Sequence, residues 1–130
     1  MLTAGATLVS LLAFGVASAS ATTGTTTANG FQVAASLSPD VAQKNQTVTE
    51  TAAVRNVSDK LENVRVTLAG PAPTGGPIAF AASVQPGASI SKSFSFPAGI
   101  LKPGTDRLMV TAQNLQTGAT AQASASITVN

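Results

Sequence analysis

From Phe31 to the C-terminus, apolar and polar residues alternate with a period of two. Turn residues interrupt this alternation at intervals of about ten residues, a spacing typical of β-sandwich proteins. Each apolar face has to be covered by another sheet, so the pattern predicts an all-β chain of about seven strands in two packed antiparallel sheets. The apolar positions are Phe31, Val33, Ala35 and Leu37; Val48, Ala52 and Val54; Val64, Val66 and Leu68; Ile78, Phe80, Ala82 and Val84; Ile90, Phe94 and Phe96; Leu108, Val110 and Ala112; Ala121, Ala123, Ala125, Ile127 and Val129.

Two charged residues interrupt the apolar faces of these predicted strands. Glu50 lies between Val48 and Ala52, and Lys92 lies between Ile90 and Phe94. A lysine near a strand end can lay its stem along apolar surface and keep its ammonium group in water. Glu50 has no comparable explanation, and it weakens the alternation of its own strand.

The N-terminal part of the chain has a different character, because no charged side chain occurs before Asp40. An apolar block from Leu8 to Val16 is followed by small residues from Ala17 to Ala21. A cleaved secretory signal explains the two overlapping small-x-small sites, although no Lys or Arg precedes the block. A retained hydrophobic helix that packs subunits into a filament is the second interpretation. A membrane anchor is the third, but the run is shorter than the ~20 residues that a span needs.

The chain therefore divides into three parts. Residues 1–21 are a signal peptide or a retained hydrophobic segment, which is expected to be helical. Residues 22–30, rich in Thr and Gly, are expected to form a flexible linker because they contain no apolar period. Residues 31–130 are expected to form the sandwich. The membrane is involved only through residues 1–21, during export or assembly.

The composition removes most of the side chains on which enzymes and cofactor sites depend. The chain has no Cys, so it has no disulfide, thiolate metal site or cysteine nucleophile. It also has no His, the commonest general base and transition-metal ligand. Trp and Tyr, on which sugars and nucleobases stack, are missing as well. We therefore expect no catalysis, no cofactor and no metal.

The charge pattern argues against nucleic-acid binding. Charged residues make up 9% of the chain, with seven Lys and Arg against five Asp and Glu. No two basic residues are neighbours in the sequence. Because phosphate binding needs clustered basic side chains, the chain is not expected to bind nucleic acid.

Single acidic residues offer little chemistry. Asp59 and Glu62 flank a predicted turn and are expected to be solvated there, while Asp40 and Asp106 fit turns in which Asp bonds its own backbone. Two N-glycosylation sequons begin at Asn45 and Asn56, and both are expected in accessible loops.

The segment from Val48 to Leu68 resembles the hairpin of prokaryotic extracellular Ig-like modules of the CARDB and fibronectin type III kind. Such modules carry a strand, an Asn-x-Ser/Gly-Asp turn, here from Asn56 to Asp59, and a strand reading Asn-Val-x-Val-Thr, here from Asn63 to Thr67. Similar turns and strands follow at residues 84–89, 102–112 and 118–129, so the resemblance covers residues 31–130. It implies an Ig-like antiparallel sandwich that serves as a spacer, an adhesive element or an assembly subunit.

These observations predict a secreted or cell-surface module with a structural or binding role and no catalytic activity. Its expected partners are other protein subunits or surface proteins, including copies of itself in an oligomer or filament. The alternative is a pilin-like subunit of an extracellular filament, because processed pilins also begin directly with an apolar helix. In that case residues 1–21 would pack in the fibre core.

Overall fold

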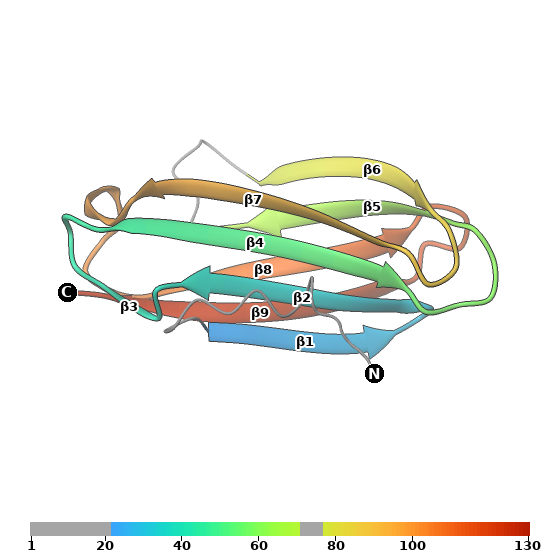
Figure 1. The fold of residues 1–130 in the computed structure, drawn as a ribbon, viewed down its shortest axis with the longest axis horizontal. Coiled ribbons are helices and arrows are strands. Elements are labelled where there is room, and N and C mark those ends of the chain that lie inside the picture. The colour runs from blue at the N-terminus through green and yellow to red at the C-terminus, as the bar shows by residue number, and fades with distance from the viewer. Residues whose placement is uncertain (1–21, 71–76) are drawn as a thin grey trace.

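A computed structural model of the chain describes residues 22–70 and 77–130. The predicted signal or helix at residues 1–21 and most of the Gly/Pro-rich break before Ile78 lie outside the described residues. The rest of the chain forms strands and one short 3₁₀ turn, η2 (Ala98–Ile100) (Figure 1). The strands are β1 (Thr22–Ala28), β2 (Phe31–Ser38), β3 (Val41–Ala42), β4 (Thr47–Asn56), β5 (Glu62–Ala69), β6 (Ile78–Val84), β7 (Ser89–Pro97), β8 (Gly104–Asn114) and β9 (Thr120–Val129).

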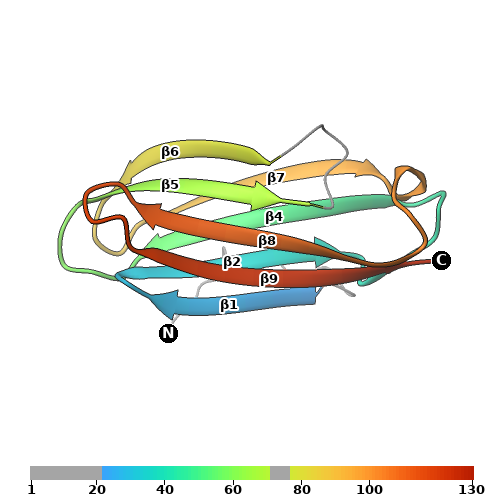
Figure 2. The ribbon, with the colours of Figure 1, turned by 180° about the vertical axis from the view of Figure 1, so that it is seen from behind.

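The strands form two sheets that pack face to face, which confirms the predicted all-β sandwich (Figures 1 and 2). One sheet has the order β1-β2-β4-β7, and the other has the order β3-β9-β8-β5-β6. The chain crosses between the sheets after β2, β3, β4, β6 and β7, and this order of strands is that of an Ig-like sandwich. Only the pairing of β3 with β9 is parallel among the described strands.

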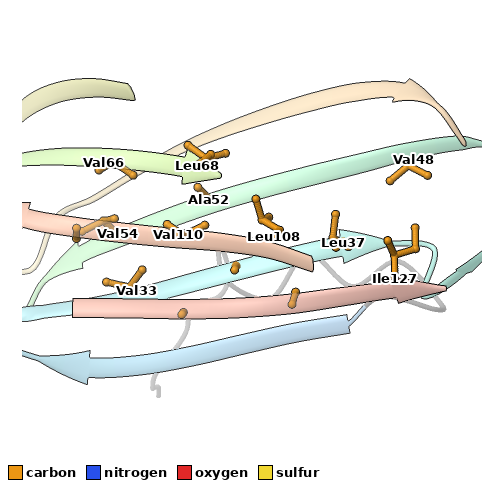
Figure 3. Close-up of a cluster of buried hydrophobic side chains, with 14 of the residues drawn as sticks. Val33, Leu37, Val48, Ala52, Val54, Val66, Leu68, Leu108, Val110 and Ile127 are labelled. Carbon is orange, nitrogen blue, oxygen red and sulfur yellow. The ribbon is translucent and has the colours of Figure 1, made fainter. Parts of the chain in front are cut away.

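The core lies between the sheets and is built from the predicted apolar positions. Val33, Val54 and Ile90 stand side by side on β2, β4 and β7, and all three face the opposite sheet. From that sheet, β5, β8 and β9 contribute residues such as Val66, Val110 and Ile127 (Figure 3). The inward residues of β9 are mostly Ala, so the two sheets approach each other closely along this strand.

The prediction of a flexible linker at residues 22–30 is wrong. Residues 22–28 form β1, which pairs antiparallel with β2 along its whole length. Asn29 and Gly30 make the turn with φ values of 54° and 86°, and an Asn-Gly pair adopts these positive angles readily in two-residue hairpins. Residues 22–30 therefore belong to the sandwich, which was predicted to begin at Phe31.

Strand β1 lies alongside β9 of the other sheet and closes this side of the sandwich (Figures 1 and 2). At Gly24 the two backbones are so close that a Cβ atom would stand 1.9 Å from the carbonyl oxygen of Ser124. At the turn, Nδ2 of Asn29 donates a hydrogen bond of 2.6 Å to the carbonyl oxygen of Thr120. Glycine is thus the residue that permits this docking.

The described residues form nine strands where about seven were expected, and the additional ones are β1 and β3. The chain leaves β2 at Ser38, and only two residues later β3 joins the opposite sheet beside the end of β9. Because Thr22 pairs with Leu37 and Val41 pairs with Thr128, the beginning of β1 and the end of β9 lie at the same end of the sandwich.

Candidate functional site

The sequon residue Asn45 lies in an exposed turn, as predicted. The turn is closed by the backbone N–H of Gln46, which donates to the carbonyl oxygen of Gln43 at 3.0 Å. Asn45 and Thr47, the first and third residues of the sequon, are both exposed. The Asn45 side chain is therefore accessible to a modifying enzyme in the folded protein.

The sequon residue Asn56 does not lie in an accessible loop, so that prediction is wrong. Asn56 ends β4 and is fully buried. Its Nδ2 donates to the carbonyl oxygens of Lys60 at 2.7 Å and Val84 at 2.8 Å. Its Oδ1 accepts from the N–H and the hydroxyl of Ser58 at 2.9 and 2.7 Å. With every polar hydrogen in use, this side chain ties the β4–β5 turn to the end of β6.

The acidic residues singled out in the sequence do not form a common site. Asp59 is exposed in its turn, whereas Glu62 is buried and its Oε1 accepts a 3.1 Å hydrogen bond from Nδ2 of Asn114. Asp40 and Asp106 are both half-buried, and Oδ2 of Asp106 is a buried atom without a hydrogen-bond partner. Within the described ranges, no group of three or more Asp, Glu, His or Cys side chains is placed to hold a metal ion.

Glu50 is the most unusual titratable residue of the core. It points inward from β4 between Leu37 of β2 and Phe94 of β7, and none of its surface is exposed. Both carboxylate oxygens are buried without a hydrogen-bond partner. Burial raises the pKa of this carboxyl above its ordinary value of 4.5, because the apolar surroundings disfavour the charged form.

Lys92 lies in the middle of β7 and not near a strand end, and it is the only inward-facing lysine of that strand. Its neighbours across and along the strand are Ala52 and the half-buried Phe94. Since β7 is the edge of its sheet, the side chain can leave the core sideways, and its Nζ lies 5.5 Å from the ring centroid of Phe80 on β6. A cation–π contact of this kind links the facing edges of the two sheets.

The outer face of the sheet containing β4 and β7 is a layer of hydroxyl groups. Ser89, Ser91, Ser93 and Ser95 are all exposed, which confirms the predicted wet face of β7. Ser93 and Ser95 form hydrogen bonds with Thr51 and Thr49 of β4, at 2.9 and 3.0 Å. These hydroxyls satisfy one another across the strands and carry no charge.

Strand β6 is an edge of the other sheet as described, and its sequence is almost free of polar side chains. Its residues are Ile-Ala-Phe-Ala-Ala-Ser-Val, and only Ser83 among them has a polar side chain. Ala79, Ala81 and Ser83 point outward and are exposed, while Ile78, Phe80 and Ala82 face the core side and are half-buried. The alternation in the sequence predicted this strand, but it carried no signal that the strand would lie at an edge.

Across the described residues, the structure has no helix with the length and apolarity that a membrane crossing requires.

No protein-family model matches the sequence, and no curated protein matches it either. Among solved structures, the fold is similar to that of Spo0M, a sporulation control protein from Bacillus subtilis, with a TM-score of 0.54 and 13% identity over 79% of this chain. A β-glucosidase from Listeria innocua in complex with isofagomine aligns with a TM-score of 0.43 and 17% identity over 76% of this chain. This chain spans 50% of the Spo0M chain and 16% of the β-glucosidase chain. At these identities the likeness to Spo0M extends to the fold alone.

Proposed function

We propose that this chain is a secreted or cell-surface module with a structural or binding role and without catalytic activity. The observation that carries this proposal is that the side chains of the central strands either pack in the core or form an uncharged polar surface. The inward face of the central strands packs into the aliphatic core, and the outward face of β4 and β7 presents uncharged hydroxyls that bond to one another. Such a hydrated surface can support contacts with other proteins, and the chain has no His or Cys with which to activate a nucleophile.

The proposed location outside the cell rests on the sequence of residues 1–21. An apolar block followed by small-x-small sites is what an export signal requires. Sequencing the N-terminus of native protein tests this proposal. A mature chain that starts near Ser20 to Thr22 supports export with cleavage, while a start at Met1 or Leu2 contradicts cleavage.

A pilin-like filament subunit is the second candidate, and the free, nearly apolar edge at β6 favours it. In such a subunit residues 1–21 would be retained in the fibre core. Electron microscopy of native material separates the two candidates. Fibres made of a chain that starts at Met1 or Leu2 would support the filament subunit, whereas monomers of a processed chain would contradict it.

The absence of catalysis is tested on purified protein. We expect no hydrolysis of ester, glycoside or peptide substrates above the buffer rate. A robust activity that survives repurification would contradict the proposed role.

A further inference from the structure

The turn between β1 and β2 contains the only Asn-Gly pair of the sequence, Asn29-Gly30. Asparagine is a thermolabile residue, because the backbone nitrogen of the following residue can attack its side-chain Cγ. Glycine has no side chain to shield that nitrogen, whereas every other asparagine with a following residue precedes Gln, Val or Leu. Asn29 is also exposed to water, which completes the reaction. The turn therefore carries the asparagine that is chemically the most reactive in the chain.

In the folded protein the Asn29 amide links the two sheets. Its Nδ2 donates a hydrogen bond of 2.6 Å to the carbonyl oxygen of Thr120, the first residue of β9. Closure of a succinimide ring would move Cγ of Asn29 onto the Gly30 nitrogen and draw Nδ2 away from Thr120. The side chain cannot do both at once, so the turn has to leave β9 before the amide can react.

We propose that Asn29 is a site of spontaneous deamidation, that opening of the β1–β2 turn sets its rate, and that the reaction releases this turn from β9 permanently. Water is the only co-reactant. The Gly30 nitrogen forms a bond to Cγ of Asn29, the Cγ–Nδ2 bond breaks, and Nδ2 leaves as ammonia with the proton of the Gly30 nitrogen. Water then opens the succinimide and leaves aspartate or isoaspartate at position 29.

Neither product restores the contact with β9. An ionised carboxylate has no hydrogen to donate, so it would meet the Thr120 carbonyl oxygen as a second acceptor. Isoaspartate also lengthens the backbone of a two-residue turn, to which Asn29 and Gly30 are fitted by φ values of 54° and 86°. Glu62 adds repulsion, since its Oε2 lies 3.4 Å from the position of a Cβ atom on Gly30.

Strand β1 keeps two other attachments after the reaction. It pairs with β2 from Thr22 to Ala28, and at Gly24 it lies against the backbone of Ser124. The turn end of β1 is thus the part that loosens. Because the ammonia is lost, refolding does not reverse the change, and the fraction of molecules with a loosened turn rises with the age of the protein.

Peptide mapping by mass spectrometry, after timed incubation of the full chain at neutral pH, tests the proposal. We expect more deamidation at Asn29 than at any other asparagine. Gly24→Ala, which displaces β1, should raise the rate at Asn29 about tenfold, the change in opening that ~1.4 kcal/mol of lost docking produces. Thr25→Ala is the matched control, because Thr25 is exposed on the same strand, and it should leave the rate unchanged. No excess at Asn29, or equal rates in the two variants, overturns the proposal.

A comparison without a variant covers the case in which Gly24→Ala does not fold. The unaltered chain unfolded in urea should then deamidate at Asn29 about tenfold faster than the folded chain, by the same relation. Equal rates in the folded and unfolded chain would show that the contact with β9 does not control the reaction.

The effect of the product is tested by placing it in the turn directly. Asn29→Asp should speed hydrogen exchange at the turn end of β1 about tenfold, again the effect of ~1.4 kcal/mol. Gln116→Glu is the matched control, since it converts an exposed amide into a carboxylate in the β8–β9 turn at the same end of the sandwich. Equal exchange in these two variants would overturn the release of the turn. The site does not depend on the proposed structural role, because the reaction needs only the turn, β9 and water.

Discussion

At the scale of single residues, Glu50 makes the stability of this protein depend on pH in an unusual direction. Most carboxyls stabilise a fold when ionised, but Glu50 is buried without a partner and its folded pKa is raised above 4.5. The folded state then binds more protons than the unfolded state as pH rises above 4.5. The contribution of Glu50 is therefore fully present below that pH and is lost as pH rises through the folded pKa.

Replacing Glu50 with Gln should remove this loss, because the amide has the same shape and does not ionise. We expect Glu50→Gln to match the original chain in free energy of unfolding near pH 3.5 and to exceed it near pH 7.5. Urea denaturation at both pH values measures the difference. If the difference in free energy of unfolding between the two proteins is the same at pH 3.5 and pH 7.5, burial of Glu50 does not control the pH dependence of stability.

The two sequons should behave differently in a host with N-glycosylation machinery. Only Asn45 is accessible in the fold, and a glycan on Asn56 would replace one of the two Nδ2 hydrogens that bond to the carbonyl oxygens of Lys60 and Val84. We expect the mass of folded, secreted protein to show at most one glycan, which Asn45→Gln abolishes. A folded species with two glycans would refute the assignment.

Asn56→Ala should also lower stability, by about 3 kcal/mol, because it leaves several buried polar groups without partners. Asn45→Ala is the control and should change stability by less than about 0.5 kcal/mol, as is usual at exposed positions.

At the scale of secondary-structure elements, the docking of β1 depends on one position. A Cβ at Gly24 would lie 1.9 Å from the Ser124 carbonyl oxygen, which belongs to the backbone and cannot rotate away. Gly24→Ala is therefore expected to displace β1 and to lower the free energy of unfolding by roughly 1–3 kcal/mol. Hydrogen exchange should show faster exchange in β1 and along the adjacent part of β2, with the remaining core unchanged.

Thr25→Ala provides the comparison, since Thr25 is exposed on the same strand and its replacement meets no neighbouring backbone. Equal exchange rates in the two variants would mean that close approach at Gly24 does not hold β1 in place.

The strands that the sequence predicted are those that bury one apolar face in the core. β2, β5 and β9 alternate cleanly because one face of each is in the core. β1 was missed because its Thr-rich sequence buries little apolar surface, and backbone pairing with close docking holds it instead. Only the Asn29-Gly30 pair, a hairpin signal, could have revealed it.

The environments of single polar residues were harder to foresee. Glu50 interrupted the apolar face of its strand, but alternation alone does not tell that its carboxyl is fully buried and has no hydrogen-bond partner. Asn56 matched a sequon, while its burial arises from Lys60 and Val84, which meet it only in the folded chain. The edge position of β6 and the outward path of Lys92 follow from strand order, which period-two patterning does not encode.

At the scale of the whole molecule, the described part of the chain builds a continuous core between the two sheets. The buried core residues of this part belong to strands β2 to β9 or to the η2 turn region, and β1 closes its side. A chain that begins at Thr22 is therefore expected to fold, with a melting temperature within about 2 °C of the full chain, less than the shift that 1 kcal/mol produces at this size. A loss of cooperative unfolding in this shortened chain, measured by circular dichroism, would contradict the expectation.

The start of β1 and the end of β9 lie at one end of the sandwich, so the two ends of the molecule differ. A partner attached at Thr22 or at Asn130 would hold the same end of the sandwich. The β4–β5 and β8–β9 turns lie at the opposite end, and they carry the exposed side chains Val57, Leu61 and Leu115. A tethered copy would thus present these aliphatic residues at the end farther from its tether, and the hydroxyl groups of β4 and β7 would lie along its side.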